Sequence, residues 1–249
     1  MAHRLAVISG GGTGIGAAAA QALADDGYQV WIIGRRAQVL AEAARRISER
    51  CGRPDAVVSV AADLTDPVEV DRVRDTVGDQ PVDVLVNNAG AYVRAAADAT
   101  TADTAANWRA TFDVNVVSAV LLTEALRPVL RRPGGRVILM SSIAAQRGGG
   151  GPYSAAKAAL HGWVFDLAAR FGPEGITANV ISPGYVADTE FFTGRMTPQG
   201  HQSRVDATLV GRAGTPDDIA AAVRYLASPA AGFVTGQIIG VNGGSVYGR

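Results

Sequence analysis

A tyrosine and a lysine one helical turn apart are the residues of this sequence best placed to move a proton. They are Tyr153 and Lys157, in the segment Tyr-Ser-Ala-Ala-Lys. On a helix, residues four positions apart lie on the same face. A free tyrosine titrates near pH ~10, but a nearby cation favours the phenolate and brings the group closer to neutral pH. The pair therefore predicts a general acid/base. The alternative is a solvated lysine beside a core tyrosine.

The element that carries the pair is expected to be a helix that begins after the glycines at 148–151. The intervening residues are serine and alanine, which are small enough for a cofactor or a second helix to approach closely. The rest of the chain must decide between catalysis and packing.

A glycine-rich stretch near the N-terminus predicts a phosphate site. An apolar run at 5–8 suits a buried strand, residues 9–16 contain five glycines, and an alanine-rich helix follows from Ala17 to about Asp26. In this context the glycines let the backbone approach a pyrophosphate, and the helix N-terminus faces its charge. A flexible glycine turn is the alternative, but both flanks favour the phosphate site.

Two arginines follow the second predicted strand, at 30–33. In dinucleotide-binding folds, an acid at the end of this strand binds the adenosine ribose, whereas an arginine accommodates a 2′-phosphate. This chain has no acid there and instead has Arg35 and Arg36. NADP is therefore favoured over NAD, unless both arginines are only solvated charges that open the helix at 37–50.

Composition excludes several classes of function. The 249 residues are 48% apolar and carry 23 basic against 23 acidic side chains, which gives no electrostatic reason to expect nucleic acid or an anionic membrane as partner. Cys51 is the only cysteine, and His3, His161 and His201 are too scattered for a metal site. No signal-peptide core or membrane-spanning segment is expected, so the prediction is a soluble cytoplasmic protein.

The remaining chain alternates apolar runs with helical patterns, which predicts one doubly wound parallel α/β domain of the Rossmann type over residues 1–249, with helices on both faces. Residues 185–212 show no clean period and are expected to form loops and short helices, with a substrate lid at about 187–212. Asp66 is expected to cap a helix that begins at Pro67, and Thr215 begins another. Further strands are expected at 56–61, 82–86, 135–140, 177–181 and 237–241, and a long helix at 104–131.

Polar residues stand where several of these strands end, and one stands inside an apolar stretch. Asp63 follows the third strand, Asn87 the fourth, and Ser142 the fifth. Asn115 interrupts the apolar run at 112–117 and needs hydrogen-bond partners if it is buried. Considered alone, it is best explained by a helix-packing hydrogen bond.

Together these motifs resemble the short-chain dehydrogenase/reductase family over essentially the whole chain. Their order and spacing are similar to the single-domain branch, and in particular to 3-oxoacyl-[acyl-carrier-protein] reductase-like members. The motifs are residues 9–16, residues 87–90, Asn115, Ser142, Tyr153 with Lys157, and Pro183 with Gly184.

The resemblance implies four catalytic residues. Tyr153 would exchange the proton with the substrate oxygen, and Ser142 would hydrogen-bond that oxygen. Lys157 would hold the nicotinamide ribose and favour the tyrosinate. Asn115 would bind a water that links Lys157 to solvent.

It also implies a set of cofactor contacts and no metal. Asp63 would contact the adenine, Asn87 and Gly90 would line the adenosine side, and Val186 would meet the nicotinamide through its backbone. The full set is Ser9, Gly10, Gly12, Thr13, Gly14, Ile15, Gly16, Arg35, Arg36, Asp63, Leu64, Asn87, Ala89, Gly90, Tyr153, Lys157, Pro183, Gly184 and Val186.

The chain departs from the family pattern in two places. Ser9 stands where threonine is usual, which keeps the hydroxyl. The interval from Ser142 to Tyr153 is short and includes the glycines at 148–151. If the loop does not run directly, Ser141 or no serine would reach the substrate.

The implied function is an NADP-dependent oxidoreductase that interconverts a ketone and a secondary alcohol on a small-molecule substrate, in a homotetramer. One alternative is a 3-oxoacyl-[acyl-carrier-protein] reductase, but Glu174 stands where such enzymes tend to have arginine. Another is a non-catalytic NADP-binding regulatory protein. The arginines expected to attract an acidic carrier protein are Arg127, Arg131, Arg132, Arg195, Arg204 and Arg212. The expected pocket-lining residues are Tyr92, Val93, Ala144, Arg147, Tyr185, Phe191, Phe192 and Met196.

Overall fold

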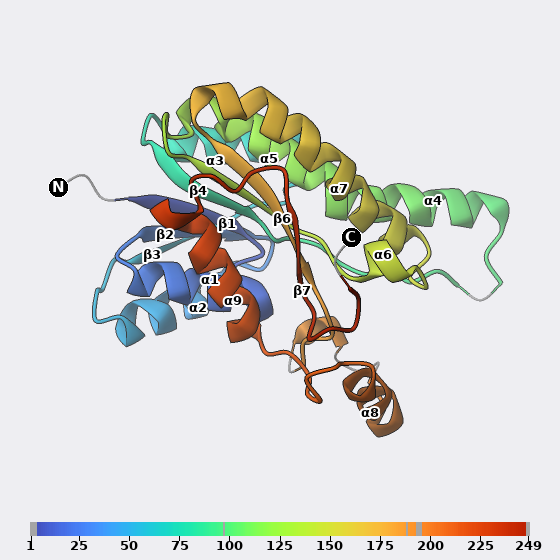
Figure 1. Ribbon diagram of the computed structural model, residues 1–249. Coiled ribbons are helices and arrows are strands. Elements are labelled where there is room, and N and C mark those ends of the chain that lie inside the picture. The colour runs from blue at the N-terminus through green and yellow to red at the C-terminus, as the bar shows by residue number, and fades with distance from the viewer. Residues whose placement is uncertain (1–3, 97, 188, 193–195, 248–249) are drawn as a thin grey trace.

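The computed structural model describes residues 4–96, 98–187, 189–192 and 196–247. A seven-stranded parallel sheet forms its centre, in the order β3-β2-β1-β4-β5-β6-β7 (Figure 1). This confirms the predicted doubly wound parallel α/β fold. The strands are β1 Leu5–Ser9, β2 Gln29–Gly34, β3 Val57–Ala61, β4 Val82–Asn87, β5 Arg136–Met140, β6 Thr177–Pro183 and β7 Ile238–Val241.

Helices cover both faces of the sheet and bury two apolar cores. Successive strand residues alternate between the cores: Ala6 and Ile8 face α1, α2 and α9, whereas Leu5 and Val7 face α3, α5 and α7 (Figure 1). Because both faces are covered, the inner strands are continuous apolar runs. The first set of helices spans Gly14–Asp25, Ala37–Arg50 and Pro216–Ala227, and the second spans Pro67–Val77, Ser118–Leu126 and Pro152–Phe171.

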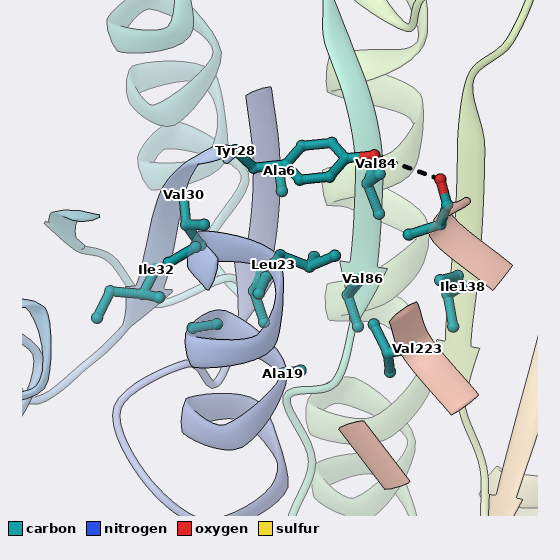
Figure 2. Packing of buried hydrophobic residues seen from close by; sticks show 14 of the residues in the cluster. Ala6, Ala19, Leu23, Tyr28, Val30, Ile32, Val84, Val86, Ile138 and Val223 are labelled. Atoms are coloured by element: carbon teal, nitrogen blue, oxygen red, sulfur yellow. Dashed lines mark hydrogen bonds between the residues drawn. The ribbon is translucent and has the colours of Figure 1, made fainter. Parts of the chain in front are cut away.

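Figure 2 shows the first core, where α1 and α9 pack against the sheet. Leu23 of α1 and Val223 of α9 belong to one cluster with strand residues such as Val86 and Ile138, and all four are at most 1% exposed. The Tyr28 hydroxyl donates to the Ala227 carbonyl at 3.3 Å, so this polar group has a partner within the apolar layer. This packing fixes the position of the α1 N-terminus.

The strand order places a crevice at the carboxyl end of the sheet. From β1 the chain winds outward to β2 and β3 on one side, and then returns to β4 on the other. The loops that leave β1 and β4 therefore diverge, and ligands of open α/β sheets bind at such a switch point. Strand order alone thus positions a binding site beside Ser9 and Asn87.

The helical segment predicted over about 104–131 is confirmed, but it is not a regular α-helix throughout. The Asn115 amide donates to the Thr111 carbonyl at 2.9 Å and also reaches another loop, and the helix takes a π-helical turn around it. At the other end, Pro128 cannot continue the α-helical hydrogen bonds, so the α-helix stops at Leu126. The segments are α4 Thr101–Phe112, a π-helix Asp113–Val117, α5 Ser118–Leu126 and a 3₁₀ turn Arg127–Val129.

Both predicted helix caps are confirmed, and one short helix was missed. The Asp66 carboxylate accepts from the Val68 N–H at 2.9 Å, and Thr215 forms a capping box with Asp218. The missed helix is α6, Ala144–Arg147, whereas α8, Pro198–Asp206, is one of the short helices expected within 185–212; both lie away from the N-terminus in Figure 1. Within 187–212 the structure describes α8 and a 3₁₀ turn, Glu190–Phe192, while residues 188 and 193–195 lie outside the described residues. Across the described ranges, no helix combines the length and apolarity needed to cross a bilayer.

Candidate active site

A cleft of about 470 Å³ runs along the carboxyl ends of β1 to β6. It brings together most of the residues singled out from the sequence, from segments far apart in the chain. Ser9, Asn87 and Asn115 do not line it. The predicted residues that do are Gly10, Gly12, Thr13, Gly14, Ile15, Gly16, Arg35, Arg36, Asp63, Leu64, Ala89, Gly90, Ser142, Tyr153, Lys157, Pro183, Gly184 and Val186.

The glycine turn after β1 is built by close backbone contacts. A Cβ on Gly16 would lie 2.1 Å from the Gly10 carbonyl oxygen, so no side chain fits there. Gly14 has φ +52°, and α1 begins at this residue, earlier than predicted. The first turn of α1 contains no acidic side chain, so its unpaired N–H groups and positive dipole end remain available to an anion. The turn therefore fits a phosphate group.

Ser9 and Asn87 do not line the cleft but make buried hydrogen bonds next to it. Ser9 is 2% exposed, and its hydroxyl oxygen accepts from the N–H groups of Asn88 and Ala89, both at 3.0 Å. Asn87 is also buried and donates to the Thr123 hydroxyl at 2.8 Å. The serine hydroxyl thus fastens the β4 loop to the end of β1, and Asn88, absent from the predicted set, lines the cleft in place of Asn87.

The arginines after β2 lie at one end of the cleft, together with Asp63. Arg36 binds the Glu190 carboxylate with two nitrogens, at 2.6 and 3.3 Å, and the Thr13 hydroxyl donates to the same carboxylate at 3.2 Å. The Arg36 guanidinium holds the pKa of the Glu190 carboxyl below its usual value. Glu190 was not expected here, because its segment has no sequence period that would place it.

Tyr153 and Lys157 lie at the other end of the cleft, on α7. Lys157 is 3% exposed, its Nζ donates to the Met140 carbonyl at 2.9 Å, and this Nζ lies 5.8 Å from the centre of the Tyr153 ring. Burial lowers the pKa of Lys157 to about 8. The Tyr153 ring is flanked by Tyr92, at 6.1 Å between ring centres, and by Phe191, at 5.5 Å.

Glycines form the last part of the short loop between Ser142 and Tyr153. Three of the four residues at 148–151 have φ between +55° and +83°, a region that only glycine enters freely. The Gly150 N–H donates to the Ser154 hydroxyl at 2.9 Å, which ties the loop to the first turn of α7. The loop therefore runs directly, and Ser142 and Tyr153 line the same cleft.

Ser141 and Ser142 have different hydrogen-bond partners. The Ser141 hydroxyl donates to the Lys157 carbonyl at 2.9 Å and lies 2.9 Å from a ring nitrogen of His161. Ser142 accepts from the Ala144 N–H at 3.1 Å. Among the described residues this is the one hydrogen bond of the Ser142 hydroxyl, so its proton is available to a ligand, whereas the Ser141 proton is already used.

Asn115 stands behind Lys157 and binds the loop after β4. Its side chain accepts from the Ala91 N–H at 3.2 Å and donates to the carbonyls of Ala91 and Thr111, at 2.8 and 2.9 Å. A Cβ on Gly90 would lie 2.6 Å from the Asn115 oxygen and 2.9 Å from the Lys157 nitrogen. The asparagine, the lysine and a glycine without a side chain thus form one tightly packed cluster.

Comparison with known proteins decides the family. A family model described as enoyl-(acyl carrier protein) reductase matches residues 10–246. The chain belongs to the short-chain dehydrogenase/reductase family. The predicted resemblance is confirmed, and the protein is an oxidoreductase of this family.

Relatives of this family match the chain over nearly its full length. An uncharacterized oxidoreductase of Methylorubrum extorquens is 35% identical, covering 97% of each chain. A 3-oxoacyl-[acyl-carrier-protein] reductase of Synechocystis is 31% identical, covering 98% of this chain and 97% of its own. The solved complex of RhlG with NADP from Pseudomonas aeruginosa superposes with a TM-score of 0.88 at 31% identity, covering 98% of this chain and 97% of that one.

Two of the eight residues expected to line the substrate pocket line the cleft, whereas Val93, Ala144, Arg147, Tyr185 and Met196 do not, and the Phe192 side chain lies outside the described residues. Tyr92 and Phe191 line the cleft beside Tyr153. Tyr185 is 8% exposed and hydrogen-bonds His201 of α8 at 2.8 Å, so it anchors that helix. Within the described ranges, no three histidine, cysteine or acidic side chains are grouped to hold a metal ion.

Proposed function

We propose that this protein catalyses the NADP-dependent interconversion of a ketone and a secondary alcohol, with Tyr153 as the general acid/base. The observation that carries the proposal is that Tyr153, Ser142 and Lys157 line the same cleft as the glycine turn and the two arginines. A proton-transfer group therefore shares one cavity with a phosphate-binding turn.

The cleft suits a dinucleotide that carries a 2′-phosphate. The glycine turn and the α1 N-terminus would bind the pyrophosphate, and Arg35 and Arg36 would bind the 2′-phosphate. Asp63 and Leu64 would contact the adenosine end, and Val186 the nicotinamide end. RhlG, which shares this fold, was solved with NADP. When bound, NADP supplies or accepts the hydride.

The side chains of the chain move the proton and hold the substrate. In reduction Tyr153 donates its proton to the carbonyl oxygen, and in oxidation it takes the proton from the alcohol. Ser142 donates its free hydroxyl proton to the same oxygen as negative charge develops. Lys157, charged at neutral pH, stabilises the phenolate. Asn115 holds the backbone beside Lys157, where a water relay would reach solvent.

A carbonyl and alcohol panel with NADPH, NADH and the oxidised cofactors tests this function. We expect turnover of at least one ketone or alcohol, with NADP(H) preferred, and a shift towards NAD(H) in Arg35→Asp. Tight NADPH binding with no hydride transfer across the panel would instead support a regulatory protein.

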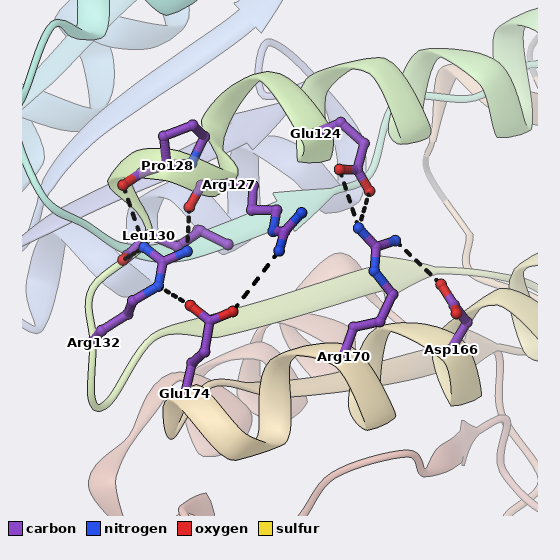
Figure 3. A network of polar contacts seen from close by, with 8 residues as sticks. All are labelled: Glu124, Arg127, Pro128, Leu130, Arg132, Asp166, Arg170 and Glu174. Atoms are coloured by element: carbon purple, nitrogen blue, oxygen red, sulfur yellow. Dashed lines mark hydrogen bonds and ion pairs between the residues drawn. The ribbon is translucent and has the colours of Figure 1, made fainter.

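A free ketone is favoured over a carrier-linked substrate. Figure 3 shows that the arginines near the ends of α5 and α7 bind neighbouring carboxylates. A fourth arginine on this surface is paired in the same way, so four arginines meet four acids and the group offers no net positive charge to an acidic carrier protein. The pairs are Arg127 and Arg132 with Glu174, Arg131 with Asp83, and Arg170 with Asp166 and Glu124.

Of the three other arginines expected to attract an acidic carrier protein, one is paired with an acid, one donates to an uncharged carbonyl and keeps its charge, and one is not described. Arg212 binds Asp218 at 2.6 Å, Arg204 donates to the Gly200 carbonyl at 3.0 Å, and Arg195 lies outside the described residues. Activity on a carrier-linked substrate that falls steeply with salt, next to salt-independent activity on a free ketone, would reverse this preference.

We also propose a cytoplasmic homotetramer. Trp108, Val117 and Phe165 are 43%, 37% and 55% exposed on α4, the π-helical turn and α7, and such apolar side chains suit a subunit interface. A single cysteine that forms no intrachain disulfide suits a reducing compartment. Gel filtration with light scattering should give four subunits, and Phe165→Glu should lower that number.

A further inference from the structure

Glu190 places a carboxylate on the groups proposed to bind the 2′-phosphate. It belongs to the 3₁₀ turn Glu190–Phe192, far from β2 in sequence. Arg36 reaches it with two nitrogens, at 2.6 and 3.3 Å, and Thr13 with its hydroxyl, at 3.2 Å. All three residues line the cleft. The guanidinium fork and the hydroxyl thus form an anion site that this chain fills with its own carboxylate.

A carboxylate and a phosphate compete for such a site because both use the same donors. The planar guanidinium binds either anion with two parallel N–H bonds. Arg36 cannot form its two parallel N–H bonds with Glu190 and with a phosphate at the same time. If Glu190 stayed in place, its negative charge would lie beside the phosphate and repel it.

We propose that Glu190 is a specificity-determining residue that competes with the 2′-phosphate of NADP(H) for Arg36 and lowers the preference of the enzyme for NADP(H) over NAD(H). This inference rests on the proposed function, because it takes Arg36 as the phosphate-binding residue. NAD(H) carries a hydroxyl in place of that phosphate and does not compete with Glu190 for the fork.

The pair is weak enough for a phosphate to displace it. The side chains of Arg36 and Glu190 are 58% and 53% exposed, and exposed ion pairs contribute little stability. Release of Glu190 therefore costs NADP(H) a small part of its affinity, roughly two- to fivefold in Kd. The phosphate still binds, but less tightly than Arg36 alone would permit.

Displacement of Glu190 is also expected to affect residues near Tyr153, through the chain neighbours of Glu190. The Thr189 hydroxyl donates to the Val186 carbonyl at 3.4 Å, and the Phe191 ring packs 5.5 Å from the Tyr153 ring. Both neighbours of Glu190 in the chain therefore contact residues of the cleft. A change in the partner of Glu190 is expected to shift the position of Phe191.

Fluorescence titration of NADPH and NADH into the full-length protein tests the proposal. In Glu190→Gln, which keeps the size of the side chain and removes its charge, we expect Kd for NADPH to fall roughly two- to fivefold and Kd for NADH to stay unchanged. The matched control is Glu49→Gln, which removes the same charge from an exposed arginine pair, with Arg45, at the far end of α2. It should change neither Kd.

The double variant Arg36→Ala with Glu190→Gln separates competition from a general charge effect. In the Arg36→Ala background, Glu190→Gln should no longer tighten NADPH. If the single variant Glu190→Gln binds NADPH as tightly as the wild type or more weakly, Glu190 does not compete with the phosphate. That result would overturn this inference and leave the proposed function intact. A wild-type protein that binds NADH as tightly as NADPH would instead overturn the cofactor assignment.

Discussion

The two ends of the cleft are built in different ways. At the end proposed to bind the cofactor, backbone contacts and buried hydrogen bonds fix the shape: no Cβ fits on Gly16, and the Ser9 hydroxyl binds two N–H groups of the β4 loop. At the end proposed to bind the substrate, the lining includes the side chains of Tyr92 and Phe191, which lie on segments outside the sheet and the long helices.

The fold therefore determines the shape of the proposed cofactor end, whereas the side chains at the proposed substrate end can vary without changing the fold. The shape of the proposed cofactor end follows from strand order and from the turn after β1, so a side chain added to a glycine of this turn disturbs main-chain packing. The substrate end consists of replaceable side chains on a common scaffold, which is how one fold accepts many substrates. The two ends should therefore respond differently to substitution, and Tyr153 and Lys157 stand where they meet.

The largest effect is expected from Tyr153→Phe. The substitution removes the proton that the ketone oxygen needs, while the ring keeps its contacts with Tyr92 and Phe191. We expect kcat to fall by roughly 10²- to 10⁴-fold, with little change in Kd for NADPH. Single-turnover kinetics and a binding titration measure both quantities. Unchanged turnover of every accepted substrate would remove Tyr153 from the mechanism.

Gly16→Ala tests the rigidity of the cofactor end. The added Cβ would lie 2.1 Å from the Gly10 carbonyl oxygen, so the glycine turn must shift. We expect a loss of about 1–3 kcal/mol in the free energy of unfolding and roughly tenfold weaker NADPH binding. The control is Gly172→Ala, whose Cβ meets no atom within 4 Å. If Gly16→Ala binds NADPH as the wild type does, the contrast between the two ends is wrong.

Lys157→Met should stabilise the cofactor-free protein while it abolishes activity. The pKa of Lys157 falls from 10.5 to about 8 on burial, so the unfolded chain keeps a proton that the folded chain loses between these pH values. Wild-type stability therefore rises with pH across that window, and below pH 8 the buried charge destabilises the fold. Methionine does not titrate, so we expect a gain of about 1–3 kcal/mol at pH 7 that shrinks above pH 8.

Denaturant unfolding at pH 7 and pH 9.5 measures this difference. A Lys157→Met protein that is less stable than the wild type at pH 7 would show that the hydrogen bond to the Met140 carbonyl outweighs the cost of the buried charge.

The smallest effect is expected at the substrate end, from Phe191→Ala. The ring packs on the Tyr153 ring, with 5.5 Å between the ring centres. We expect KM for an apolar ketone to rise roughly three- to tenfold, which corresponds to the lost ring contact, with stability unchanged. Steady-state kinetics on two ketones of different size checks this. A global loss of stability would place Phe191 in the scaffold.

The sequence predicted the cofactor end better than the substrate end, for physical reasons. The glycine turn and the polar residues at strand ends depend on local patterns, and the structure gathers nearly all of them in one cleft. The Glu190 contact with Arg36 joins residues 154 positions apart, through a segment with no periodicity. Nothing local to either residue encodes such a pairing.

Asn115 shows the same limit within a helix. Its apolar surroundings indicated burial, and a packing hydrogen bond was the simpler explanation. The structure shows that its partners include the backbone of Ala91, and that the helix departs from regular geometry around it. A single apolar run cannot reveal a π-helical turn, because the turn is set by the loop that the asparagine must reach.

The π-helical turn at Asp113–Val117 also fixes the length of this segment. It contains one residue more than a regular helix would need to span the same distance. Deleting that residue would restore ideal geometry and turn one half of the helix by about 100° relative to the other. Either Asn115 would leave the β4 loop or Leu122 would leave the core. The extra residue therefore lets one helix face bind the loop after β4 while another face packs in the core. Insertions or deletions in this segment should be tolerated far less than substitutions.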